Sequence, residues 1–188
     1  MILPEEKKLF YTPVWEYRVE DYEELNVLLR EDIRTFETGN FFHNKGRGAA
    51  ALFAIFKSAV FQIAERYPWQ KSPVHFRCRV NPIEPLEIDT PHFHSDCRVV
   101  GVYYLHVPPG SGDILLHDPR GYTNWDYDPS SNTITDNSPA KEKNRSARAY
   151  HRITPREGTM LLHPSYVVHS VEPNFSDEIR ISLAMVAN

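Results

Sequence analysis

The chain has 188 residues, 41% of them hydrophobic, and its 21 basic and 25 acidic residues give a formal net charge of -4. This length suits one domain with a full core, so we expect a single domain over residues 1–188, with an N-terminal strand and two helices in 1–70 and a β-rich core in 74–188. A mildly acidic chain without a long run of either charge lacks the basic surface that nucleic acid or an anionic membrane would require, and this favours a small-molecule or peptide substrate.

The N-terminus lacks the basic-then-apolar order of a signal peptide, and no apolar run approaches the roughly 20 residues that span a bilayer. We therefore expect a soluble, cytoplasmic protein without a membrane segment. In that compartment the two cysteines, Cys78 and Cys97, are expected to be reduced. Neighbouring strand residues point to opposite faces, so Cys97 should point away from Asp96 and not act as a metal ligand.

The first third of the chain predicts one strand and two helices. Segment 10–19 alternates in the manner of an edge strand, which, if exposed, could mediate a homodimer. Segment 21–37 has apolar residues at helical spacing, with Asp21 as a candidate N-cap and a glutamate three residues later. Segment 48–69 is apolar nearly all round, and Pro68 should end this second helix.

Short apolar or alternating runs, separated by turn residues, follow from Val74 onward. The candidate strands are 74–81, 92–96, 98–107, 112–118, 149–155, 158–164, 167–173 and 180–187. Eight short strands with no helix between them predict a jelly roll of two antiparallel sheets, so the fold class is mainly β with N-terminal helices, α+β. The polar segment 118–149 is either a lid or a disordered insertion, and its aromatic residues Trp125 and Tyr127 favour the lid.

A candidate metal site lies in the sequence TPHFHSD, residues 90–96. His92, His94 and Asp96 occupy alternate positions, which share one face of an extended strand. His169 lies on a late strand that a jelly roll could bring alongside. Two imidazoles and one carboxylate leave coordination positions open, as in non-haem Fe(II) oxygenases, although three protein ligands and a water would also suit zinc.

A candidate anion site lies on the last predicted strand, where Arg180 and Ser182 share a face. A guanidinium buried by such a strand needs an anionic partner, and a carboxylate that binds both of its N–H edges is the geometric match. The alternative is an internal ion pair with Asp177 or Glu178.

Five blocks of the chain resemble the small 2-oxoglutarate and Fe(II)-dependent oxygenases of bacteria and their phages: TPHFHSD, VVGVYYL, GSGDILLHDPRG, EGTMLLHPSYVVHSVEPN and RISLAM. The early segment LFYTPVWEYRVEDYEELNVLL is also similar, so the resemblance covers nearly the whole chain. It implies a double-stranded β-helix (jelly-roll or cupin-like) with helices packed on one sheet. It also implies hydroxylation of an unidentified substrate with release of succinate and CO2.

The resemblance implies an iron site that includes His169 and a 2-oxoglutarate site in which Arg180 and Ser182 hold the C5 carboxylate. Two iron ligand sets remain open. The set of His94, Asp96 and His169 is favoured because a carboxylate offsets the charge of Fe(II). The other set is His92, His94 and His169, with Asp96 outside the coordination sphere.

Further residues are candidates for the same pocket. Asn81 and either Tyr103 or Tyr104 could add hydrogen bonds to 2-oxoglutarate. His163 stands where the family usually has an aromatic residue, and we interpret it as a pocket-facing or core residue rather than a ligand.

Two other functions fit the same residues. One is a metal-dependent cupin-like enzyme without 2-oxoglutarate, in which Arg180 would pair internally. The other is a metal-free jelly-roll protein with a binding or structural role, which would bind no stoichiometric metal.

Overall fold

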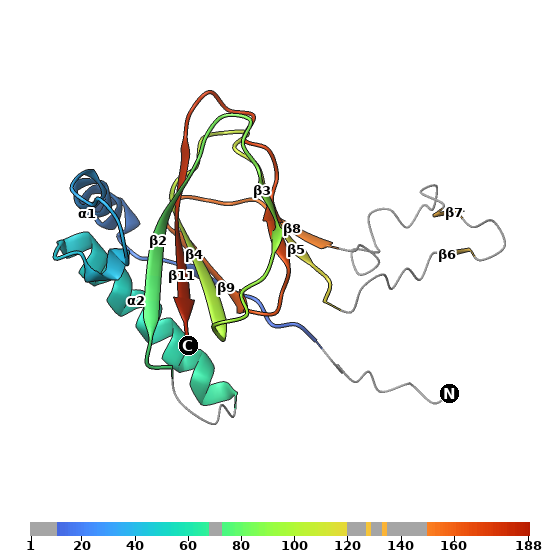
Figure 1. Ribbon diagram of the computed structural model, residues 1–188, viewed down its shortest axis with the longest axis horizontal. Coiled ribbons are helices and arrows are strands. Elements are labelled where there is room, and N and C mark those ends of the chain that lie inside the picture. The colour runs from blue at the N-terminus through green and yellow to red at the C-terminus, as the bar shows by residue number, and fades with distance from the viewer. Residues whose placement is uncertain (1–10, 68–72, 120–126, 129–132, 135–149) are drawn as a thin grey trace.

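The structure is a computed structural model that describes residues 11–67, 73–119, 127–128, 133–134 and 150–188. Two helices lie on one side of two antiparallel sheets (Figure 1). The elements are β1 Trp15–Arg18, α1 Tyr22–Arg34, the 3-10 helix η1 Phe41–His43, α2 Arg47–Arg66, β2 Phe76–Ile83, β3 Asp89–His92, β4 Val99–His106, β5 Ile114–His117, β6 Tyr127–Asp128, β7 Thr133–Ile134, β8 Tyr150–Ile153, β9 Thr159–Pro164, β10 His169–Val171 and β11 Arg180–Ala187. Most of segment 118–149, including Trp125, lies outside the described residues, so the lid prediction is not tested.

The two sheets have the strand orders of a double-stranded β-helix. The larger sheet runs β1-β9-β4-β11-β2 and the smaller sheet runs β3-β10-β5-β8, while β6 and β7 pair only with each other. All pairings within both sheets are antiparallel. The predicted fold, with two helices preceding a jelly roll and packed on one of its sheets, is confirmed.

Alternation along the central strands divides the apolar residues into two cores. On β11, Leu183, Met185 and Ala187 pack in the cluster between the larger sheet and the helices. The inner cluster lies between the two sheets and includes Tyr104 of β4 and Leu116 of β5. Side chains of opposite parity on β4 and β11 therefore point into the inner space, where a ligand could bind.

The two helices form the outer layer over the larger sheet (Figure 1). Helix α2 buries Leu52, Phe56 and Val60 in the core against that sheet. With 20 residues and a mean hydropathy of 1.3 in its most apolar window, α2 is long and apolar enough to cross a bilayer by these two criteria. This differs from the expectation that no apolar run approaches that length. The packing of α2 against the sheet is that of a core helix.

Helix α1 begins after Asp21, as predicted, but the Asp21 side chain makes no capping hydrogen bond. The residue has a positive φ of 49°, and its carbonyl accepts the first helical bonds from the N–H groups of Glu24 and Leu25. The predicted helix is therefore present, but the side-chain cap is not formed.

Candidate metal and co-substrate site

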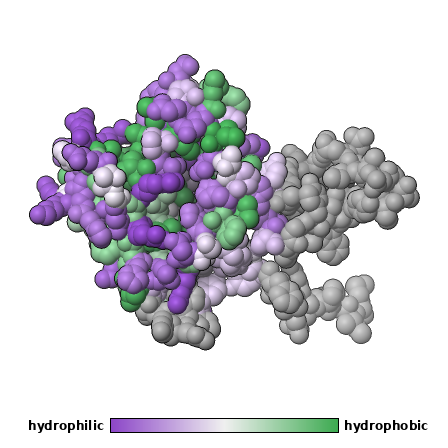
Figure 2. Space-filling view, viewed as in Figure 1, coloured by the Kyte–Doolittle hydropathy of each residue, from purple (hydrophilic) through white to green (hydrophobic). Residues whose placement is uncertain are grey.

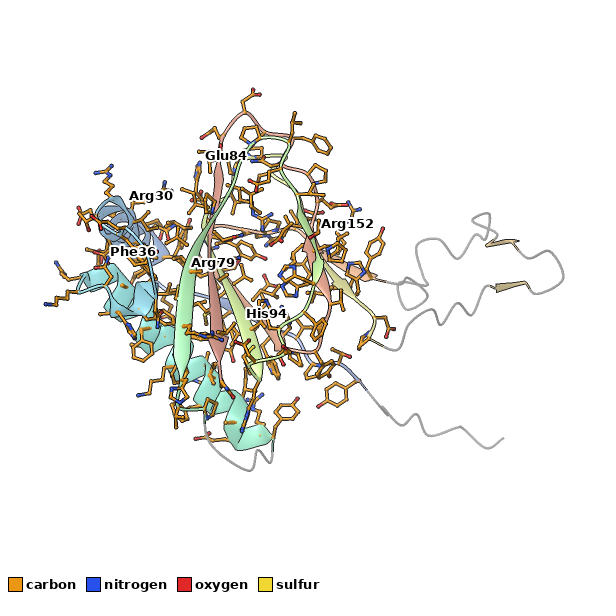
Figure 3. The ribbon with its side chains drawn as sticks, viewed as in Figure 1. Arg30, Phe36, Arg79, Glu84, His94 and Arg152 are labelled. Atoms are coloured by element: carbon orange, nitrogen blue, oxygen red, sulfur yellow. The ribbon has the colours of Figure 1, made fainter. Side chains whose placement is uncertain are left out.

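Three histidines meet on the smaller sheet. His92 ends β3 and lies opposite His169 of β10 in the strand register, while His94 follows in the loop after β3. One ligand nitrogen of each residue lies within 4.8 Å of the other two. Figure 3 shows His94 beside the space between the two sheets.

Backbone carbonyls hold two of these imidazoles by Nδ1. His92 Nδ1 lies 2.7 Å from the carbonyl oxygen of Thr90, and His169 Nδ1 lies 3.2 Å from that of Val167. A proton on Nδ1 that donates to the carbonyl leaves the lone pair of Nε2 for a metal, which is the usual arrangement of metal-binding histidines. The donor set therefore fits a divalent transition metal such as Fe(II).

The protonation states also suit metal binding. Burial lowers the pKa of His169 to about 3, and the neighbouring His163 adds to this effect. Burial also lowers the pKa of His94, with His92 as the next cause. Both imidazoles are therefore neutral at physiological pH, as a metal ligand must be.

Asp96 lies apart from the histidine cluster. Strand β3 ends at His92, and residues 95–96 form a turn, so the alternation that would place Asp96 beside the histidines does not continue. The Asp96 carboxylate is 59% exposed and forms an ion pair with Arg77. The hydrogen bond from Arg77 lowers the pKa of Asp96 below its usual value. The geometry thus brings together His92, His94 and His169, but not the carboxylate that the favoured sequence interpretation included.

Cys97 is not in the histidine cluster either. Burial raises its thiol pKa to about 11, so the thiol stays protonated.

Arg180 is a buried cation without a carboxylate partner in the described part of the chain. It is 1% exposed, and its Nη1 donates to the carbonyl oxygens of Ser111 at 3.3 Å and Gly112 at 2.8 Å. Its Nε has no hydrogen-bond partner. Glu178, the partner considered from the sequence, instead lies 3.2 Å from His106 Nε2. Burial lowers the pKa of Arg180, while Tyr104, Asp113 and Asp89 raise it in part. An anion bound at the guanidinium would offset more of the cost of its desolvation.

Other unpaired polar atoms lie next to this guanidinium. The Arg180 guanidinium carbon is 5.3 Å from the ring centre of Tyr104. The Tyr104 hydroxyl interacts with Arg180 but makes no hydrogen bond of normal geometry among the described residues. The hydroxyl of Ser111, whose carbonyl binds Arg180, is also buried and unpaired. Three polar atoms from Arg180, Tyr104 and Ser111 are thus available to a small polar ligand.

The other residues that the sequence suggested for the 2-oxoglutarate pocket are Tyr103, Ser182 and Asn81, and their side chains do not all face Arg180. Tyr103 points to the helix side of the larger sheet, where its hydroxyl donates to Asn26 Oδ1 at 2.6 Å, so Tyr104 is the tyrosine beside Arg180. Ser182 is buried, and its hydroxyl lies 3.5 Å from the carbonyl oxygen of Asn81. The Asn81 side chain accepts a hydrogen bond from Arg79.

His163 lies in the inner space beside His169, with the two ring centres 4.7 Å apart. It is fully buried, its Nδ1 lies 2.9 Å from the carbonyl oxygen of Pro164, and its Nε2 has no partner among the described residues. It is not in the three-histidine group.

Residues 77–185, more than half of the chain, match the protein family described as "Putative 2OG-Fe(II) oxygenase". The chain belongs to this family. Family membership implies Fe(II) and 2-oxoglutarate, and the histidine cluster provides a candidate metal site of the expected kind. No curated protein matches the chain.

Solved structures of similar fold include several 2-oxoglutarate oxygenases. A prolyl-4-hydroxylase from Pseudomonas putida is 16% identical with a TM-score of 0.62, over 94% of this chain and 88% of that one. EvdO2 from Micromonospora carbonacea var. aurantiaca, complexed with 2-oxoglutarate, is 15% identical with a TM-score of 0.58, over 94% and 86%. A prolyl hydroxylase from Trichoplax adhaerens, in complex with a peptide fragment of the hypoxia-inducible factor oxygen degradation domain, is 14% identical with a TM-score of 0.57, over 93% and 82%. At these identities the likeness shows the fold.

Proposed function

We propose that this chain is an Fe(II)- and 2-oxoglutarate-dependent dioxygenase that hydroxylates a small-molecule or peptide substrate. The observation that carries the proposal is the pairing of two sites on facing sheets. The three-histidine cluster lies on the smaller sheet, and the unpartnered Arg180 lies on the larger sheet.

In this proposal His92, His94 and His169 hold the iron through neutral imidazoles. Bound iron and 2-oxoglutarate supply the oxidation chemistry, in which O2 converts 2-oxoglutarate to succinate and CO2 and the substrate C–H group to C–OH. The backbone bonds of His92 and His169 fix the orientation of both rings before the metal binds, so little ordering of these ligands is needed on binding.

Arg180 binds the C5 carboxylate of 2-oxoglutarate in the proposed site. Its Nη1 is held by two backbone carbonyls, and its unpaired Nε remains available as a donor. The Tyr104 hydroxyl, and Ser182 on the same face of β11, add neutral hydrogen-bonding groups. The apolar side chains of the inner cluster strengthen these charge-assisted bonds because they exclude water.

The test is an anaerobic titration of Fe(II)-loaded protein with 2-oxoglutarate, followed by the weak visible charge-transfer band of the chelate. We expect the band in the wild type, no metal binding in His169→Ala, and metal binding with a greatly weakened band in Arg180→Met. Circular dichroism shows whether each variant is folded, and Co(II) absorption measures metal binding separately from 2-oxoglutarate binding. The same samples exposed to O2 should form succinate.

Other outcomes would select the rival functions. Iron binding without a band in the folded wild type would favour a cupin-like metalloenzyme that does not use 2-oxoglutarate. Absence of stoichiometric metal binding would favour a metal-free jelly-roll protein.

A further inference from the structure

A cleft of about 450 Å³ lies beside two of the clustered histidines. His92 and His94 line it together with Arg77, Arg79 and Asp96. Figure 3 labels Arg79 on β2 and His94 after β3, on facing sides of the space between the sheets. A molecule in this cleft would therefore contact the proposed metal centre from the side of β2.

One of the two arginines that line this cleft has no carboxylate partner among the described residues. Arg77 forms an ion pair with Asp96, so these two charges offset each other. Arg79 donates to the neutral Asn81 Oδ1 at 3.2 Å and forms no ion pair with any carboxylate in the described ranges. Figure 2 shows strongly hydrophilic side chains gathered over the middle of this face, where β2 and β11 run in Figure 1. The cleft thus offers a net positive charge within electrostatic reach of the proposed metal centre.

A second hollow of about 600 Å³ adjoins the cleft at β2, the edge strand of the larger sheet. The two hollows are adjacent because Asn40, Arg77, Asp96 and Val186 line both. The second hollow also has three aromatic walls, provided by Phe42, Phe53 and Phe76. One elongated molecule could therefore place a polar end near the histidines and an apolar end among the phenyl rings.

We propose that the substrate carries a carboxylate that binds Arg79 and an apolar portion that fills the aromatic hollow. This inference rests on the proposed function, since it concerns the substrate of the same centre. A carboxylate suits the site because the planar guanidinium can bind both of its oxygens. A single unpaired arginine balances one negative charge, whereas a phosphate dianion would leave one charge unbalanced and facing Asp96.

The test uses 4-phenylbutyrate and its neutral analogue 4-phenylbutanamide, with binding to the metal-free protein measured by ligand-observed NMR. We expect the acid to bind at least about tenfold more tightly than the amide, because a charge-assisted bond is lost in the amide. Arg79→Gln should remove this preference, and Arg79→Lys should partly restore it. The matched control is Arg34→Gln, which removes the same charge from the exposed end of α1 and should have no effect.

Several results would overturn the inference: equal binding of acid and amide, no binding of either, or equal losses in Arg79→Gln and Arg34→Gln. If saturating 2-oxoglutarate abolishes binding of 4-phenylbutyrate, the carboxylate of 4-phenylbutyrate binds at Arg180. This result would also overturn the inference. A second readout separates this inference from the proposed function. Mn(II) bound at the histidines should broaden the resonances of the bound acid; Arg79-dependent binding without this broadening would leave the anion site standing and count against the metal centre.

Discussion

At the scale of single residues, the metal affinities of His92 and Asp96 variants distinguish the two candidate sets of iron ligands. We predict that His92→Ala lowers Co(II) or Fe(II) affinity by more than about 100-fold, because it removes one of three clustered nitrogens. Asp96→Asn should change the affinity by less than about threefold, because the Asp96 carboxylate pairs with Arg77 at the surface. Metal titrations followed by Co(II) absorption would measure both. The reverse pattern, with Asp96→Asn abolishing binding, would restore the two-histidine, one-carboxylate set.

The buried histidines predict a pH dependence for the metal-free protein. Burial lowers the pKa of His163 to about 4 and that of His169 to about 3, whereas the ordinary histidine value is 6.5. Below pH 6.5 the unfolded chain therefore takes up protons that the folded chain does not, and the free energy of unfolding falls with falling pH until the folded pKa values are reached. At about pH 5 this costs roughly 2 kcal/mol for each histidine.

Urea unfolding with a chelator present, at about pH 7, 6 and 5, would measure this slope. His163→Phe, which places an aromatic residue at the same buried position, should reduce the slope by about one proton. An unchanged slope in that variant would show that His163 is accessible to protons in the folded protein.

Residue identities alone could not choose between the two adjacent tyrosines. Tyr103 and Tyr104 lie in a run of β4 that is buried on both sides, so hydropathy gives no sign of which face each residue occupies. Which of the two tyrosines faces the ligand depends on which layer covers each face of β4. Helices cover the face of Tyr103, and the smaller sheet covers the face of Tyr104. Arg180 and Ser182 both lie on the inner face of β11, opposite Leu183 on the helix side. Alternation predicted that they share a face but not which face it is.

At the scale of elements, the close crossing of α1 and α2 depends on Gly48. A β-carbon at this position would lie 2.6 Å from the backbone nitrogen of Leu29 and 2.7 Å from the carbonyl carbon of Leu28. Helix propensity alone favours alanine over glycine by about 1 kcal/mol. Overpacking against a backbone that cannot rotate away costs about 1–3 kcal/mol or more, so we predict that Gly48→Ala is destabilising. Chemical denaturation would measure this change, and a stabilised variant would show that the helices can separate at little cost.

Strand positions were predictable from the sequence, but strand ends were less so. Every predicted strand but one is present at its expected place, because alternating apolar runs and turn residues are local signals. The segment around His94 is the exception. The sequence predicts a strand over 92–96, whereas β3 spans Asp89–His92 and pairs with β10 there. The partner strand β10 determines where β3 stops pairing, and local periodicity in the sequence does not show this. Alternation continued through residue 96 therefore placed Asp96 with the histidines.

At the scale of the whole molecule, the proposed centre is divided between the two sheets. The smaller sheet supplies the histidines, and the larger sheet supplies Arg180 and Tyr104. The helices pack only on the outer face of the larger sheet, which leaves its inner face for the ligand. A ligand that binds the metal and Arg180 together would therefore link the two sheets.

This division predicts a specific order of stabilisation. Mn(II) alone should raise the melting temperature, 2-oxoglutarate alone should have little effect, and both together should add a further increase, because the co-substrate needs the metal and Arg180 at once. At a 2-oxoglutarate concentration about 100 times its dissociation constant, the further gain in unfolding free energy is about 2.7 kcal/mol.

Differential scanning fluorimetry of wild type and Arg180→Met would measure these increments. The variant should keep the increment from Mn(II), since the histidines of the smaller sheet are intact, and should lose most of the increment from 2-oxoglutarate. Ser182→Ala is the graded comparison: it removes one neutral hydroxyl from the same face of β11 and should lose only part of the increment. An undiminished 2-oxoglutarate increment in Arg180→Met would mean that the larger sheet does not hold the co-substrate through this residue, and the buried guanidinium would then have a structural role.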